Sequence, residues 1–156
     1  MKTISVGAFL QRFESPYEAV TVREEATLRE VMETLLRHHE QRSVFVVDGE
    51  GVLRGVIAVG TLARHLLHEE IAPAGGFSPA PAILHYLTAE CAGDIMDKTV
   101  LSCTMDEPLE EAMVKMLGKK LFKTLPVLDE KGRIVALLSV ISLLEFGLDG
   151  AGESET

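Results

Sequence analysis

The chain has 156 residues, of which 47% are hydrophobic and 25% charged, a composition typical of an ordered globular protein. With 24 acidic and 15 basic residues its formal net charge is -9, so most of its surface would repel a phosphate backbone, and nucleic acids are excluded as expected partners. The positive mean hydropathy of +0.20 indicates apolar surface covered by another chain, for which a homodimer is the simplest arrangement.

No sequence feature indicates export or membrane insertion. Residues 1–10 hold one lysine and no long apolar core, unlike a signal peptide. The longest apolar stretch, 134–144, contains two serines and is too short to span a bilayer. We therefore expect a cytoplasmic protein.

Catalytic and metal-binding patterns are also missing from the sequence. It has no glycine-rich dinucleotide loop, no phosphate loop and no nucleophile elbow, so we expect no enzyme activity. His65 and His68 are one helical turn apart but lack a third ligand at a defined spacing, and we predict no metal site. Cys91 and Cys103 show no metal-ligand spacing, which predicts two free thiols.

An internal repeat organises the chain. Shifted by 81 residues, residues 20–62 align without a gap with residues 101–143. The identical pairs are Leu28 and Leu109, Glu30 and Glu111, Met32 and Met113, Leu36 and Leu117, Val46 and Val127, Asp48 and Asp129, Gly51 and Gly132, Val59 and Val140, and Leu62 and Leu143.

The first copy begins with a short strand at 20–22. Thr27 followed by Glu30 forms a capping box, which predicts a helix from Thr27 to about His39. The apolar run 44–47 is typical of a strand buried on both faces. A tight turn at 48–51, a strand at 53–59 and a helix from Thr61 to about His68 complete the copy.

The second copy predicts the same elements. Asp106 or Glu107 caps its first helix, Pro108 fits the first turn, and Gly118 lies near the end. The later elements are a buried strand at 125–128, a turn at 129–132, a strand at 134–140 and a helix from Ser142 to about Phe146.

These elements predict an α/β (α+β) fold of two β-α-β-β-α repeats that pack sheet to sheet as an intramolecular pair with pseudo-two-fold symmetry. The expected domains are a first repeat with an N-terminal lead-in helix at 1–70 and a second repeat at 91–148. A connector at 71–90 joins them, with a Pro/Gly segment at 72–81 and a helix at 82–90. The acidic tail 149–156 is expected to be disordered.

Residues 125–139 (LPVLDEKGRIVALLS), together with Gly-Asp-Ile-Met at 93–96, resemble the cystathionine-β-synthase (CBS) domain family. The likeness covers nearly the whole chain as a tandem pair, and residues 6–10 form a weaker lead-in to the first copy. It implies a regulatory module that usually dimerises into a flat disc. Such a module binds an adenosyl ligand, AMP, ADP, ATP or S-adenosylmethionine, in clefts between its repeats.

The resemblance also implies ligand-binding positions after the second hairpin strand. The family has Ser or Thr at the end of that strand and, three residues later, an Asp that binds the ribose hydroxyls. The second copy has Ser139 and then Ser142, while the first has Ala58 and then Thr61. Both aspartates are absent, and a hydroxyl makes a weaker, neutral contact with a diol than a carboxylate does.

The resemblance places the purine pocket around the buried strand and the short strand before it. The corresponding residues are Thr99, Val100, Phe122, Lys123, Thr124, Leu125 and Pro126 in the second copy, and Gln41, Arg42, Ser43 and Val44 in the first. Phe122 either stacks on the base or packs in the core. Lys119, Lys120 and Lys123 either hold phosphates or form a solvated helix end.

Three hypotheses follow. The chain is an adenosyl-ligand sensor that acts on a client enzyme or transporter in trans. Alternatively, it is a dimeric protein-interaction module with degenerate clefts, or a binder of a non-adenosyl metabolite over which residues 77–87 fold. Because the second copy keeps Ser139 and the nearby basic cluster, we expect it to hold the better-equipped site.

Overall fold

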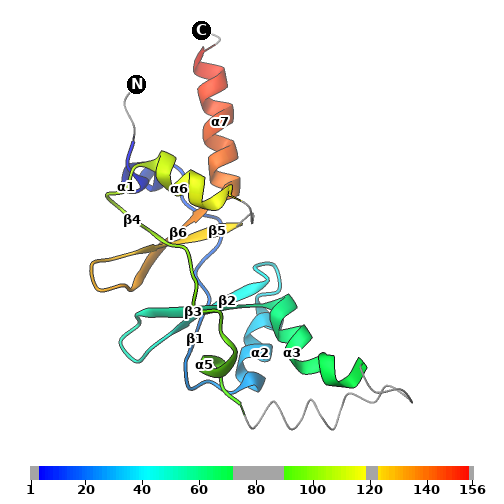
Figure 1. Cartoon of the computed structure of the whole chain (residues 1–156). Coiled ribbons are helices and arrows are strands. Elements are labelled where there is room, and N and C mark those ends of the chain that lie inside the picture. Colours follow the sequence, from blue (N-terminus) through cyan, green and yellow to red (C-terminus); the bar gives the residue numbers. More distant parts are fainter. Residues whose placement is uncertain (1–3, 72–89, 119–122, 155–156) are drawn as a thin grey trace. The chain divides into compact units, whose positions relative to one another are not determined.

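The computed structural model describes residues 4–71, 90–118 and 123–154 (Figure 1). The predicted connector helix and Pro/Gly segment, Lys119, Lys120 and Phe122 lie outside these residues. The chain divides into two compact units. The repeat-1 unit is Val20–Val100, and the repeat-2 unit is Met1–Ala19 with Leu101–Thr156.

The repeat-1 unit contains a three-stranded sheet with its helices on one side (Figure 1). Its elements are β1 (Thr21–Arg23), α2 (Leu28–Arg37), β2 (Ser43–Val47), β3 (Leu53–Ala58), α3 (Val59–Ile71) and α5 (Ala92–Ile95). In the sheet order β1-β2-β3, β1 is parallel to β2 and β2 is antiparallel to β3.

The repeat-2 unit has the same sheet topology in the order β4-β5-β6. Its elements are α1 (Val6–Arg12), β4 (Cys103–Thr104), α6 (Leu109–Met116), β5 (Thr124–Leu128), β6 (Ile134–Ser139) and α7 (Val140–Ser154). The predicted α+β fold of two β-α-β-β-α repeats is therefore confirmed.

The hairpins are stabilised by the same side chain in both units. Asp129 Oδ1 accepts hydrogen bonds from the backbone N–H groups of Lys131 and Arg133, both 2.9 Å away. Gly132 has a φ of 84°, a left-handed conformation that glycine adopts without steric cost. These bonds, the Arg133 N–H first, lower the pKa of the Asp129 carboxyl. The equivalent Asp48 forms the first hairpin in the same way.

The first helix of each repeat begins differently. Thr27 caps α2 as predicted, and its Oγ1 accepts from Glu30 N at 3.2 Å. The predicted cap of α6 by Asp106 or Glu107 is wrong, because Pro108 is the N-cap residue. Glu107 instead pairs with Lys115, whose Nζ lies 3.0 Å from Glu107 Oε1.

Each unit has its own hydrophobic core. The repeat-1 core is Val20, Val22, Ala26, Leu28, Val31, Leu35, Val44, Val46, Ile57, Leu62, Leu66 and Ala92. The repeat-2 core is Val6, Phe9, Phe13, Cys103, Leu109, Ala112, Met116, Leu125, Val127 and Leu138. Sheet and helices thus share one apolar layer in each unit.

The lead-in helices pack away from the repeats that follow them directly in sequence. α1, which the sequence analysis grouped with the first repeat in 1–70, packs in the repeat-2 unit. There Val6 N donates to Glu107 O at 2.9 Å, and Phe9 and Phe13 pack against Phe146 of α7. α5 packs in the repeat-1 unit, where Ala92 N donates to Ala26 O at 2.8 Å.

The last helix of each repeat is longer than predicted. α3 begins at Val59, directly after β3, and α7 begins at Val140, directly after β6. α7 continues to Ser154, through most of the tail that was expected to be disordered. Its glycines lower helix propensity by about 1 kcal/mol each but do not end a helix as proline does. Within the described part of the chain, no helix has the length and apolarity needed to cross a membrane.

Candidate functional site

The strand-to-helix junction of repeat 2 brings together four of the predicted site residues, Lys123, Thr124, Ser139 and Ser142. Thr124 and Ser139 are register partners at the end of the β5–β6 ladder. Lys123 immediately precedes β5, and its carbonyl accepts from Val140 N, the first residue of α7, at 3.0 Å. This backbone bond fixes the start of α7 beside the start of β5.

The equivalent junction of repeat 1 has the same strand pairing and the same backbone hydrogen bond. Ser43 pairs with Ala58, and Arg42 O accepts from Val59 N at 2.8 Å. Arg42 is exposed and has a φ of 60°, a left-handed conformation that costs a non-glycine residue about 1 kcal/mol. Thr61 is exposed on α3. Arg42 in repeat 1 and Lys123 in repeat 2, both cations, thus occupy matching positions at the two strand-to-helix junctions.

The two serines of repeat 2 are buried at the junction. Ser139 Oγ accepts from Ile141 N at 3.2 Å, which caps the start of α7. Ser142 is 1% exposed, and its hydroxyl donates to Glu14 O at 3.2 Å. Both hydroxyls thus hold the junction together, and the Ser142 bond attaches the segment after α1 to α7.

That segment also supplies a residue that the sequence analysis did not identify. Lys123 Nζ lies over the ring of Tyr17, 4.2 Å from its centroid, a cation–π contact. Tyr17 lines a cleft of about 450 Å³ in the repeat-2 unit. The other walls of the cleft are residues 14–19, the β6 residues 134–137, Leu10 and Met105. The Lys123 contact therefore lies at the edge of a cleft.

The remaining predicted residues lie apart from this junction. Leu125 is part of the repeat-2 core, and its neighbour Pro126 is also buried in β5. Thr99 and Val100 belong to the repeat-1 unit, where Thr99 N donates to Asp97 Oδ1 at 2.9 Å. In repeat 1, Gln41 and Val44 flank the Arg42–Ser43 pair along the chain.

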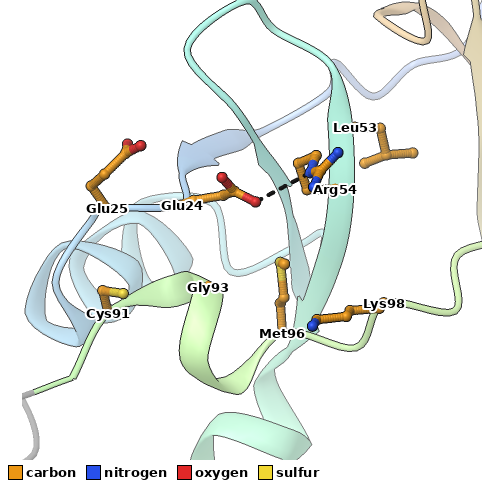
Figure 2. A pocket seen from close by; sticks show the side chains of 8 residues that line it. All are labelled: Glu24, Glu25, Leu53, Arg54, Cys91, Gly93, Met96 and Lys98. Carbon is orange, nitrogen blue, oxygen red and sulfur yellow. Dashed lines mark hydrogen bonds and ion pairs between the residues drawn. The ribbon is translucent and has the colours of Figure 1, made fainter.

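A second cleft, of about 710 Å³, lies in the repeat-1 unit (Figure 2). It is bounded by the start of β3, the residues after β1, and α5 with the segment that follows it. Its lining residues are Glu24, Glu25, Leu53, Arg54, Cys91, Gly93, Met96 and Lys98. Arg54 Nε lies 3.2 Å from Glu24 Oε1.

The histidine and cysteine side chains that the structure describes do not gather into a metal site. His65 Nε2 lies 2.6 Å from Glu90 Oε2, which joins α3 to the end of the connector. The His68 side chain lies outside the described residues. No group of three or more His, Cys, Asp and Glu side chains suited to a metal ion occurs in residues 4–66, 90–118 and 123–149. Cys91 and Cys103 are free thiols, as predicted.

The profile of the family described as CBS domain matches residues 15–68 and 92–149. The chain belongs to the CBS domain family. Because the match occurs twice, the predicted tandem CBS pair is confirmed. The comparison with curated proteins finds no match.

Solved structures of CBS proteins are similar over most of the chain. The CBS domain-containing protein tm0935 from Thermotoga maritima is 27% identical with a TM-score of 0.66, over 92% of this chain and 94% of that one. The CBS-pair protein CBSX2 from Arabidopsis thaliana is 20% identical with a TM-score of 0.69, over 95% of this chain and 96% of that one.

A third similar structure is the cytosolic domain of the Mg²⁺ channel MgtE in complex with ATP. It is 27% identical with a TM-score of 0.60, over 82% of this chain. This chain spans only 44% of the length of that one.

Proposed function

We propose that this CBS pair is a cytoplasmic regulatory module that binds an adenosyl ligand, AMP, ADP, ATP or S-adenosylmethionine, and acts on a partner protein in trans. Similar CBS structures carry such ligands: ATP in the MgtE cytosolic domain, AMP in CBSX2, and 5′-methylthioadenosine with S-adenosylmethionine in MJ0100. Of these three structures, the MgtE domain has the highest sequence identity to this chain, 27%.

The contact between Lys123 and Tyr17 carries the proposal. The Tyr17 ring borders the repeat-2 cleft and offers an aromatic face on which a purine stacks. The Lys123 ammonium lies 4.2 Å from the same ring and supplies a cation for a phosphate. Base and phosphate recognition would therefore come from two side chains that the fold brings together.

The buried Ser142 limits how much the ribose of the ligand can contribute to the binding free energy. Ser142 occupies the position of the family's ribose aspartate, but its hydroxyl already donates to Glu14 O at 3.2 Å. A ribose diol therefore gains no charge-assisted hydrogen bond at that position. We expect affinity to increase with phosphate charge, in the order adenosine, AMP, ADP, ATP.

Isothermal titration tests this proposal. The wild-type chain is titrated with AMP, ADP, ATP and S-adenosylmethionine beside the variants Lys123→Gln and Lys131→Gln. Loss of the Lys123 charge should weaken ATP binding about tenfold or more, because a hydrogen bond to a charged group is lost. Lys131, an exposed hairpin residue, is the matched control and should have no effect.

Flat titrations with all four ligands would overturn the proposal. They would favour the second candidate, a dimeric protein-interaction module, which the occupied Ser142 hydroxyl and the missing aspartates also support. In that case a client should be retained equally well with and without nucleotide. The third hypothesis, a non-adenosyl metabolite under residues 77–87, stays a prediction that native mass spectrometry checks.

A further inference from the structure

The cleft of the repeat-1 unit combines opposite charges with an apolar wall (Figure 2). Glu24 and Glu25 contribute two carboxylates, and Arg54 and Lys98 contribute two cations, so the formal charges of the lining cancel. In Figure 2 the Met96 side chain lies between the Glu24 carboxylate and the Lys98 ammonium. A balanced lining of this kind favours a ligand that carries both charges.

The charges differ in how far they are already paired. Glu24 Oε1 is bonded to Arg54 Nε, but a carboxylate has about four lone-pair sites and retains capacity for a second donor. Lys98 makes no hydrogen bond or ion pair with any residue that the structure describes. The cleft therefore offers one unpaired ammonium and one partly used carboxylate.

The repeat itself shows that the fold does not need these charges. Shifted by 81 residues, Lys98 corresponds to Tyr17, Arg54 to Val135 and Glu24 to Met105. All three counterparts line the repeat-2 cleft and none is charged. At these three positions the repeat-2 cleft is aromatic and apolar, and its charged lining residues, Glu14 and Glu18, are both acidic. The repeat-1 cleft has charges of both signs, which indicates a different ligand.

The apolar wall of the repeat-1 cleft depends on Gly55. A Cβ at that position would lie 2.6 Å from Met96 Sδ and 2.9 Å from Asp97 O. Only glycine lets the Met96 segment approach β3 closely, and Val56 N donates to Asp97 O at 3.0 Å to hold it there. Met96 and Leu53 then give the charged cleft a fixed apolar surface.

We propose that this cleft binds a small zwitterionic metabolite, an α-amino acid with an apolar side chain. Its carboxylate pairs with Lys98, its ammonium with the carboxylate of Glu24, and its side chain packs on Met96 and Leu53. The volume of about 710 Å³ is sufficient for such a ligand and lies in the usual range of small-molecule sites.

Three matched probes test both charges. L-leucine carries both, 4-methylpentanoate lacks the amine, and 3-methylbutylamine lacks the carboxylate. We expect saturable binding of L-leucine by titration calorimetry, and binding about tenfold or more weaker for each single-charge analogue. Lys98→Gln should weaken L-leucine binding about tenfold, while Lys131→Gln should not.

Cys91 provides an independent measurement at the cleft. Its side chain lines the cleft and is partly exposed, whereas Cys103 is 2% exposed, so N-ethylmaleimide should modify Cys91 in the folded protein. Bound L-leucine should slow this modification in the wild type. In Lys98→Gln the same concentration should slow it less, and circular dichroism melting verifies that the variant is folded.

The proposal is overturned if neither L-leucine nor L-methionine titrates at millimolar concentration, or if Lys98→Gln binds L-leucine as tightly as the wild type. If L-leucine gives a binding signal in calorimetry but does not slow the modification of Cys91, the ligand binds outside this cleft, which would also overturn the proposal. The result is separable from the adenosyl site, because Lys123→Gln should leave L-leucine binding unchanged.

Discussion

Arg42 and Lys123 hold the same backbone position in the two repeats but have different neighbours. Lys123 lies over Tyr17, which the lead-in segment brings to the repeat-2 junction. The residue of the repeat-1 unit that corresponds to Tyr17 is Lys98, a cation with no face for a base. Stacking combined with phosphate binding is therefore available in one repeat only, and we expect one adenosyl site per chain.

Cys103 gives the repeat-2 core a pH dependence. Burial, with a smaller contribution from Glu107, raises the pKa of its thiol from 9.0 to about 11. The unfolded thiol ionises near pH 9 and the folded one near 11, so its contribution is complete below pH 9 and is lost as the pH rises toward 11. This loss should amount to about 2 kcal/mol of unfolding free energy.

Urea unfolding between pH 8 and pH 11 in reducing buffer measures this effect. The comparison variant is Cys103→Ala, which is less stable at pH 8 because it leaves a small cavity but lacks the thiol titration. The stability difference between the two proteins should narrow as the pH rises. Parallel curves over the whole range would contradict the assignment.

Residues whose roles depend on local chemistry were predictable from the sequence. The Asp and Gly of each hairpin act through backbone groups within four residues, so Asp129 and Gly132 indicated their turn directly. Tyr17 was not predictable as a site residue. Its contact with Lys123 joins positions far apart in the chain, and it depends on which unit the lead-in segment packs against.

Helix α5 depends on one residue of a different element. Because Gly55 in β3 has no side chain, the segment after α5 can lie against the sheet. Gly55→Ala should lower the unfolding free energy by about 1 to 3 kcal/mol, because the Asp97 carbonyl is backbone and cannot turn away as a side chain would. The measurement is the urea midpoint of the variant against the wild type.

Gly147 in α7 is the matched control for this substitution. A Cβ there meets nothing within 4 Å. Gly147→Ala should raise stability by about 0.5 to 1 kcal/mol, since alanine is the better helix former. If Gly55→Ala is as stable as the wild type, the close approach of the Met96 segment is not required.

At the scale of elements, the sequence predicted helices and strands better than their ends. α2 begins at the predicted cap because Thr27 bonds within its own first turn. α3 and α7 begin earlier than predicted because strand and helix join without a loop, through backbone bonds to Arg42 O and Lys123 O. Those acceptors are 17 residues before the helix N–H groups they bind, beyond the range of local patterns.

At the scale of the whole molecule, the exposed apolar stripe on α7 is the feature that bears on assembly. Ile141, Leu144 and Leu148 are 42%, 64% and 75% exposed and recur at the spacing of one helix face. Leu36 and Leu117, which correspond in the repeat, are exposed at 68% and 52%. These faces support the proposed homodimer, since a monomer of this size rarely leaves so much apolar surface in water.

Analytical ultracentrifugation tests the dimer. The wild type should sediment as a dimer at micromolar concentration, and Leu144→Glu should weaken association about tenfold or more, because a charge would be buried in an apolar interface. The neighbouring exposed substitution Glu145→Gln should leave the dimer intact. A wild-type monomer would refute the homodimer proposal.

The packing of α1 in the repeat-2 unit also affects the order in which the two units can fold while the chain is being synthesised. Met1–Ala19 leaves the ribosome before the repeat-1 unit does, but it completes a unit whose other part, Leu101–Thr156, is made after the repeat-1 unit. The repeat-1 unit is in effect an insertion, and it can finish folding while Phe9 and Phe13 still lack the core that buries them. During that interval the segment that holds Phe9 and Phe13 exposes its aromatic side chains, because it can pack only through contacts with residues far along the chain.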